Sequence, residues 1–151
     1  MAPDSEEQIV ELLHLASEHR LPIVPMGRGS AFWLGNPVSE PPLLLSTERF
    51  NAIVDYEPRD LTGVFQAGAS LQSVQDLVNS DGLFLALDPP HAYRVTIGGL
   101  TATNFSGPLR AKYGTHLAIC AWGCGRFCRT GAVSGAVAGW SRTSPDTTSP
   151  G

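Results

Sequence analysis

The chain has 151 residues, a formal net charge of −4 and no cluster of Lys and Arg. This length fits one domain with a buried core, and the charge does not favour nucleic acid or an anionic membrane surface as a partner. No apolar run approaches the roughly 20 residues that cross a bilayer, and the N-terminus MAPDSEEQ is acidic, unlike a secretory signal. We therefore expect a cytoplasmic protein without a membrane span.

The first hundred residues predict alternating helices and strands. Ser5 and Gln8 match a capping box, and a first helix is predicted from apolar residues that follow at helical spacing, namely Ile9, Leu12, Leu13 and Ala16. Residues 21–25 predict a short strand that leads into a loop at 26–30. A second unit is predicted as a strand over 62–69, a helix whose apolar face is Leu71, Val74, Leu77 and Val78, and a strand over 83–87 that ends in DPP. This order predicts an α+β fold of α/β layers, with helices packed on a sheet.

Two loops that contain glycine, at 25–30 and 96–107, are each predicted to follow an apolar strand. Glycine allows backbone N–H groups to approach a bound anion, and Ser and Thr hydroxyls add donors. Either loop alone is also typical of an ordinary surface turn. Together they would cradle a pyrophosphate, although neither has the ending of a phosphate-binding NTPase loop or a GxGxxG that opens a helix.

Four ordered segments resemble the FAD-binding domain of the vanillyl-alcohol oxidase and p-cresol methylhydroxylase (PCMH-type) class. They are PDSEEQIVELLHLASEHRLPIVPMGRGS, VFQAGASLQSVQDLV, LFLALDPP and TIGGLTATNFSGPLRAKYGT. The LDPP and SGPLRAKYGT segments are most similar to the FAD-binding subunit of bacterial glycolate oxidase. The resemblance covers residues 3–115, which we interpret as a partial domain at 1–115.

The resemblance implies which residues bind FAD. Main-chain amides of the first loop would hold the diphosphate, at Met26, Gly27, Arg28, Gly29 and Ser30. The rest of the flavin nucleotide would lie against Pro89, Thr96, Ile97, Gly98, Gly99, Asn104, Ser106 and Gly107. Some relatives attach the flavin covalently to a histidine after the first loop, where this chain has Ser30, so non-covalent FAD is expected. Arg28 stands where many relatives have glycine, which requires that its φ is negative.

The same resemblance implies oxidation of a 2-hydroxy acid, with a hydride passing from the substrate Cα to flavin N5 and electrons leaving through FAD-linked and iron–sulphur subunits. In such enzymes a cap domain follows the FAD domain. This sequence lacks one and begins where relatives have an opening strand, so we expect a truncated chain that is not a competent oxidase and has no catalytic residue. Two alternatives stay open: a non-catalytic flavin- or nucleotide-binding fragment, and a non-functional pseudogene product.

Four further residues have expected roles near the two loops. Phe32 and Trp33 are expected to pack under the first loop. His91 either approaches the flavin or is an ordinary loop histidine, and Arg110 either pairs with a phosphate or faces solvent.

Beyond Thr115 the resemblance stops, and residues 116–151 are expected to be a poorly ordered tail that does not belong to the family. His116, Cys120, Cys124 and Cys128 recur every four residues, but four ligands along one helix cannot surround a metal ion tetrahedrally. No metal site is therefore predicted. Relatives continue on the pattern CDLLLGVxVVLPDGRxxxGGGRVVKNVAGYD. The codons of residues 139–148, shifted by one base, can encode VVKNVAGYD, and those of 126–132 can encode VLPDGR.

We therefore predict a one-base frameshift just after Thr115, and sequencing the DNA across codons 113 to 151 tests it. The expected result is that the shifted register reads VVKNVAGYD. A nucleotide sequence that cannot encode this run one base out of register would exclude the frameshift.

Overall fold

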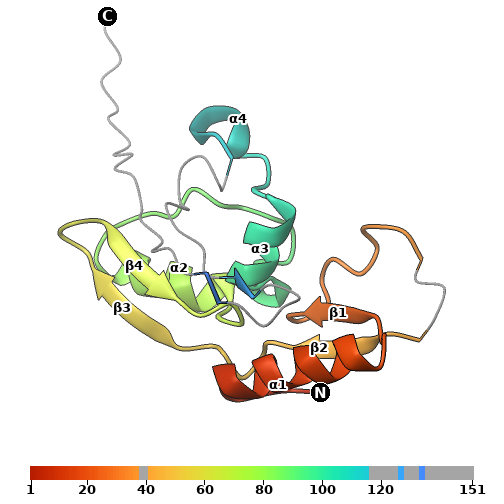
Figure 1. Ribbon diagram of the computed structural model, residues 1–151. Helices are drawn as coiled ribbons and strands as arrows, with labels where there is room; N and C mark the ends of the chain where they lie inside the picture. The colour runs from red at the N-terminus through yellow and green to blue at the C-terminus, as the bar shows by residue number, and fades with distance from the viewer. Residues whose placement is uncertain (38–40, 116–125, 128–132, 135–151) are drawn as a thin grey trace, which may run out of the picture.

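The computed structural model describes residues 1–37, 41–115, 126–127 and 133–134 (Figure 1). Within the last two ranges, β5 (Arg126–Phe127) pairs antiparallel with β6 (Val133–Ser134). The predicted frameshift and the predicted disorder both concern residues 116–151. Most of these residues lie outside the described part of the chain. His116 and the three cysteines lie outside it too.

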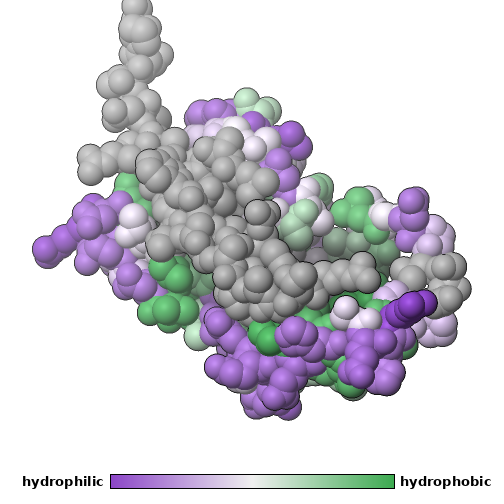
Figure 2. Space-filling model, viewed as in Figure 1, coloured by the Kyte–Doolittle hydropathy of each residue, from purple (hydrophilic) through white to green (hydrophobic). Residues whose placement is uncertain are grey.

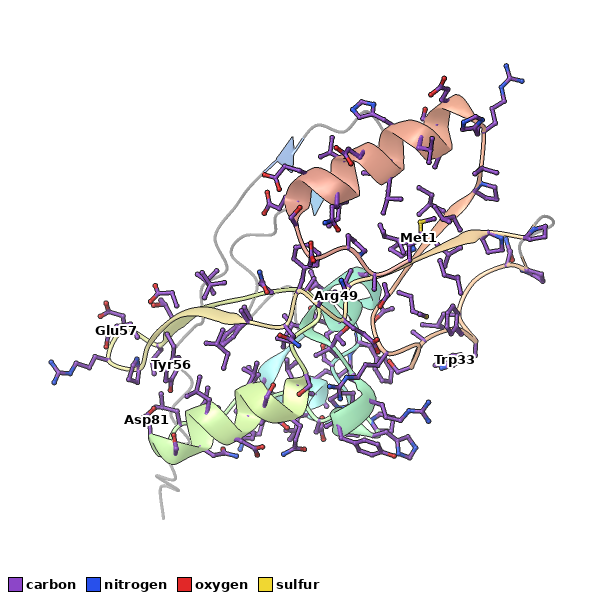
Figure 3. All side chains as sticks on the ribbon, turned by 90° about the horizontal axis from the view of Figure 1, so that it is seen from below. Met1, Trp33, Arg49, Tyr56, Glu57 and Asp81 are labelled. Carbon is purple, nitrogen blue, oxygen red and sulfur yellow. The ribbon has the colours of Figure 1, made fainter. Side chains whose placement is uncertain are left out.

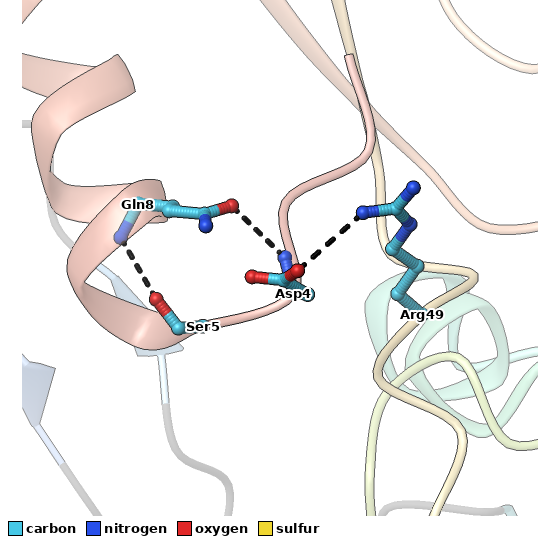
Figure 4. A network of polar contacts seen from close by, with 4 residues as sticks. All are labelled: Asp4, Ser5, Gln8 and Arg49. Carbon is cyan, nitrogen blue, oxygen red and sulfur yellow. Dashed lines mark hydrogen bonds and ion pairs between the residues drawn. The ribbon is translucent and has the colours of Figure 1, made fainter.

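Helix α1 (Glu6–Glu18) begins as the capping pattern predicts. The Ser5 hydroxyl accepts a hydrogen bond from the Gln8 backbone N–H at 3.3 Å, and Gln8 Oε1 accepts one from the Asp4 backbone N–H at 3.1 Å (Figure 4). These bonds satisfy N–H groups that a helix start leaves without an acceptor. The Asp4 carboxylate also lies 3.5 Å from the Arg49 guanidinium, an exposed pair that contributes little to stability.

Strand β1 (Ile23–Met26) pairs parallel with β2 (Leu43–Ser46), and α1 lies alongside this pair (Figure 1). On the other edge of β2, the Met1 ammonium donates to the Leu44 carbonyl at 2.7 Å, and the Ser46 N–H donates to the Met1 carbonyl at 2.8 Å. The sequence predicts β1 but not β2. Its run of three leucines is short and has no alternating pattern, so periodicity does not distinguish a strand from a buried helix segment.

Strands β3 (Ile53–Glu57) and β4 (Thr62–Phe65) form an antiparallel hairpin. Hydrophilic residues gather at its tip and over α1 (Figure 2). Strand β3 was not predicted, and β4 is shorter than the predicted strand over 62–69. The chain leaves the ladder after Phe65, and Gly68 instead donates its N–H to the Phe50 carbonyl at 2.7 Å. No helix in the described part of the chain is long and apolar enough to cross a membrane.

The core forms around α2 (Leu71–Ser80), whose Leu71, Val74 and Val78 side chains are fully buried. They pack with buried residues from the segment that follows, namely Leu85, Leu87, Val95 and Leu100. The apolar face predicted for this helix is therefore confirmed.

The predicted strand over 83–87 is wrong, because this segment pairs with no described strand. Leu85, Ala86 and Leu87 are buried one after another rather than alternately. The Leu87 N–H donates to the Leu85 carbonyl at 2.7 Å, and the Leu87 carbonyl accepts from Gln75 Nε2 at 2.6 Å. Local contacts and one side chain of α2 therefore replace the partner strand that the apolar run suggested.

The predicted loop at 96–107 is wrong in its first half. After the short 3₁₀ helix η1 (Ala92–Arg94), the helix α3 (Ile97–Thr103) occupies it, and α4 (Arg110–Tyr113) follows. Thr96 caps α3 by accepting the Gly99 N–H on its hydroxyl at 3.2 Å, and Asn104 ends it with φ of 50°. The N-cap and the burial of Leu100 against the core outweigh the low helix propensity of two glycines.

Tyr56 of β3 projects toward Asp81, the residue that caps the C-terminus of α2 (Figure 3). Burial first, and then its interaction with the negative Asp81, raise the pKa of Tyr56 to about 12. Among the described residues, no group lies at the distance and angle of a hydrogen bond to its buried hydroxyl. The phenol therefore stays protonated in the folded chain at pH values where an unfolded tyrosine ionises.

We predict that Tyr56→Phe makes the folded chain less sensitive to alkaline pH. In the wild type, the unfolded chain loses the Tyr56 proton near pH 10 and the folded chain near pH 12. Stability therefore falls as pH rises through this window. Urea unfolding at pH 7, 9, 10 and 11 measures the slope, with Tyr93→Phe on the exposed 3₁₀ helix as the control. Equal alkaline slopes for wild type and Tyr56→Phe would contradict the prediction.

Candidate cofactor-binding site

The two glycine-bearing segments predicted from the sequence meet in space. Gly27 follows the end of β1 and packs against Thr96, the N-cap of α3, so closely that a Cβ on Gly27 would collide with the Thr96 hydroxyl. Thr96 is itself held by an isolated antiparallel bridge with Ser70, next to α2. Thr96 is also buried, at 3% exposure. The first loop is thus fixed against a rigid point of the core.

Arg28 adds a second connection between the segments. Its guanidinium Nη1 donates a hydrogen bond to the Tyr93 carbonyl in η1 at 2.7 Å. Arg28 does not have a positive φ, whereas Gly29 does, at 70°. Arg28 therefore avoids the left-handed region, as a residue with a side chain in this loop must. Gly29 beside it is the left-handed residue of the loop.

The backbone amides of the two segments differ in their hydrogen bonds. Within the described residues, the N–H groups of Gly27, Arg28, Gly29 and Ser30 donate to no backbone carbonyl or side chain. In the second segment the N–H of Ile97 donates to the Ala69 carbonyl at 2.9 Å, that of Gly98 to the Ala67 carbonyl at 2.8 Å, and that of Gly99 to the Thr96 hydroxyl at 3.2 Å. Of these two sets of amides, the set at 27–30 is the one without an acceptor among the described residues.

A cleft of about 320 Å³ lies between the two segments. Of the predicted site residues, Gly29, Ser30 and Gly99 line it. The sequence analysis missed most of the other lining residues, which are Ala31, Leu34, Pro90, Arg94, Val95, Leu100, Thr103 and Phe105. Apart from Arg94 and Thr103 they are apolar like core residues, so no sequence motif marks them as lining a cleft.

The remaining predicted site residues do not line the cleft. Pro89 is buried, and Gly107 approaches Asp88 too closely for a side chain. The Asp88 N–H donates to the Ser106 carbonyl at 3.2 Å, while Asn104 ends α3. Met26 belongs to β1, and its carbonyl accepts the Thr47 N–H at 2.8 Å.

The expectation that Phe32 and Trp33 pack under the first loop holds in part. The Phe32 ring packs against Gly29 of the loop, where an added Cβ would lie 2.9 Å from Phe32 Cε2, although the side chain is 57% exposed. Trp33 is 73% exposed and lines the cleft instead, and its indole Nε1–H donates to the Ser30 carbonyl at 3.1 Å.

Of the residues with two open roles, His91 lines the cleft with φ of 57°, and Arg110 is exposed on α4 and does not line the cleft. In the described ranges no group of three or more His, Cys, Asp or Glu side chains could hold a metal ion.

The chain matches the FAD binding domain family over residues 1–122, and it belongs to this family. It is 35% identical over 114 residues to glycolate oxidase subunit GlcD of Bacillus subtilis, which covers 76% of this chain and 24% of GlcD. It is 30% identical over 113 residues to glycolate oxidase subunit GlcE of Escherichia coli, covering 74% of this chain and 32% of GlcE. The chain therefore spans a quarter to a third of these relatives.

Solved structures show the same fold. An alkyldihydroxyacetonephosphate synthase superposes with a TM-score of 0.75 at 26% identity, covering 90% of this chain and 28% of the synthase. A p-cresol methylhydroxylase with substrate bound superposes with a TM-score of 0.74 at 22% identity, covering 89% of this chain and 26% of that protein. The architecture is the α+β, PCMH-type FAD-binding fold, and FAD is the cofactor that the family binds.

We predict that Gly27→Ala destabilises the chain by about 1–3 kcal/mol, because the added methyl group has no space beside Thr96. Thr96→Ala costs about 1 kcal/mol through the lost cap of α3. In the double variant the colliding hydroxyl is gone, and Cβ of residue 96 lies 3.2 Å from the added methyl. The two losses should therefore be less than additive in urea unfolding. Additive losses would show that the contact is not the cause.

Proposed function

We propose that the first loop holds the diphosphate of FAD through its backbone amides and that the second segment holds this loop in position. The observation that carries this proposal is the contrast in hydrogen bonding, since the amides of residues 27–30 have no acceptor among the described residues and those of 97–99 do. Consecutive N–H groups in a turn that includes a left-handed glycine form an anion-binding concavity.

The fit to FAD is supported by what surrounds these amides. Gly27 has no space for a side chain, so the backbone itself forms the surface at the junction of the segments. Arg28 and Arg94 add positive charge beside the loop and in the cleft wall, which favours a diphosphate over a neutral ligand. The residue after the loop glycine is Ser30, which does not attach flavin as a histidine can, so we propose non-covalent binding.

We propose further that the protein to which this chain corresponds is a flavin-dependent 2-hydroxy-acid oxidoreductase of the glycolate type, because GlcD, GlcE and several D-lactate dehydrogenases are among the relatives. FAD supplies hydride acceptance when bound. The residues of this chain bind and orient it, and none of them is assigned a catalytic role. Partner subunits that carry a second FAD or an iron–sulphur centre belong to the same proposal.

FAD titration of the purified chain tests the cofactor proposal. We predict saturable binding that weakens as salt increases, because the charge of the diphosphate contributes to it. Trichloroacetic acid precipitation should release all flavin into the supernatant, since no covalent bond holds it. Gly27→Ala should weaken binding at least tenfold, because displacing the loop from Thr96 disturbs the amides.

Val74→Ala is the matched control for this titration. Val74 is fully buried in α2 and does not itself line the cleft, so its truncation costs stability without removing the contact between Gly27 and Thr96. At a temperature where both variants are folded, Val74→Ala should bind FAD as the wild type does. Absence of FAD binding by the folded wild-type chain would refute the proposed function, and equal weakening by both variants would refute the role of the loop.

A further inference from the structure

Trp33 is the most exposed large apolar side chain of the described residues, at 73%. It lies on the turn that follows the first loop, and its indole Nε1–H donates to the Ser30 carbonyl at 3.1 Å (Figure 3). This bond ties the ring to the loop it follows. An aromatic ring that is restrained yet exposed at the wall of a cleft is a feature that folding alone does not require.

The size and walls of the cleft indicate what would cover this ring. Its volume of about 320 Å³ lies at the lower end of small-molecule sites, which span about 300–1,000 Å³. It therefore accommodates one ring system rather than a whole dinucleotide. Leu34 and Leu100 supply apolar surface, and His91 and Phe105 add further rings to the lining. Such a lining suits a flat heteroaromatic group with polar edges.

From this geometry we propose that Trp33 is a stacking platform for a planar heteroaromatic ring of the bound ligand. The proposal rests on the proposed function, because FAD has two such rings, the isoalloxazine and the adenine. The diphosphate lies between them in FAD, and Trp33 follows the diphosphate-binding loop by three residues, so either ring can reach the cleft while the loop holds the phosphates. Stacking of the ring on the indole covers the exposed face of Trp33 and adds specificity for aromatic ligands.

Four titrations of each variant test this proposal: FAD, FMN, riboflavin and ADP. Trp33→Leu keeps an apolar side chain but removes the π face, and it should weaken FAD binding about ten- to a hundredfold. Trp33→Phe keeps a ring and should stay within about threefold of the wild type. Phe32→Leu is the matched control for damage to the loop, because the exposed Phe32 ring packs on Gly29 but does not line the cleft.

The outcomes separate the sources of the ring and the two proposals. Selective loss of riboflavin and FMN binding in Trp33→Leu assigns the isoalloxazine to Trp33, and selective loss of ADP binding assigns the adenine. Wild-type affinity of Trp33→Leu for FAD overturns the stacking role while the proposed function stands. Equal loss in Trp33→Leu, Trp33→Phe and Phe32→Leu also overturns it, because general damage to the loop then explains the effect. A folded wild-type chain that binds no FAD refutes the proposed function itself.

Discussion

The packing of Gly27 against Thr96 is the contact on which the arrangement of the site depends. Because Gly27 has no side chain, the backbone of the first loop lies directly on the N-cap of α3. Any larger residue would separate the two segments by the thickness of a methyl group. The amides of residues 27–30 have no acceptor among the described residues, and their position relative to the second segment follows from this close approach.

The core makes that contact rigid. The Leu71 N–H donates to the Val95 carbonyl at 2.9 Å, and the Ile97 N–H donates to the Ala69 carbonyl at the same distance. These bonds join the start of α2 to the segment around Thr96, while the buried face of α2 packs on Leu85, Leu87 and Leu100. The second segment is therefore anchored to α2, and the first loop, which continues from β1, packs on Thr96 within that segment. The N–H groups of residues 97–99 already have acceptors within the described part of the chain, and those of residues 27–30 do not.

The same domain serves different chemistry in its relatives. Glycolate oxidase subunits, D-lactate dehydrogenases and alkyldihydroxyacetonephosphate synthases all match this chain, although the reactions in their names differ. In each of them the matched part is a minority of the protein. A shared domain in proteins with different named reactions does not specify the substrate, because fold does not imply function. This chain therefore supports an assignment of the cofactor more strongly than an assignment of the substrate.

The amino-acid sequence by itself determined α1 with its cap, the helix face of α2, the strand before the first loop and the two glycine-bearing segments that meet in space. These features are local, since a capping residue, a helical repeat or a glycine pattern lies within a few neighbouring positions. The tertiary structure decided that residues 83–87 form no strand and that 97–103 form a helix, because partners distant in the sequence determine both. It also decided which segment has backbone N–H groups without an acceptor among the described residues, and it placed Trp33 in the cleft wall rather than beneath the loop. Pairing of amides and exposure of a ring both depend on what lies across the fold, and no local pattern of residues encodes that.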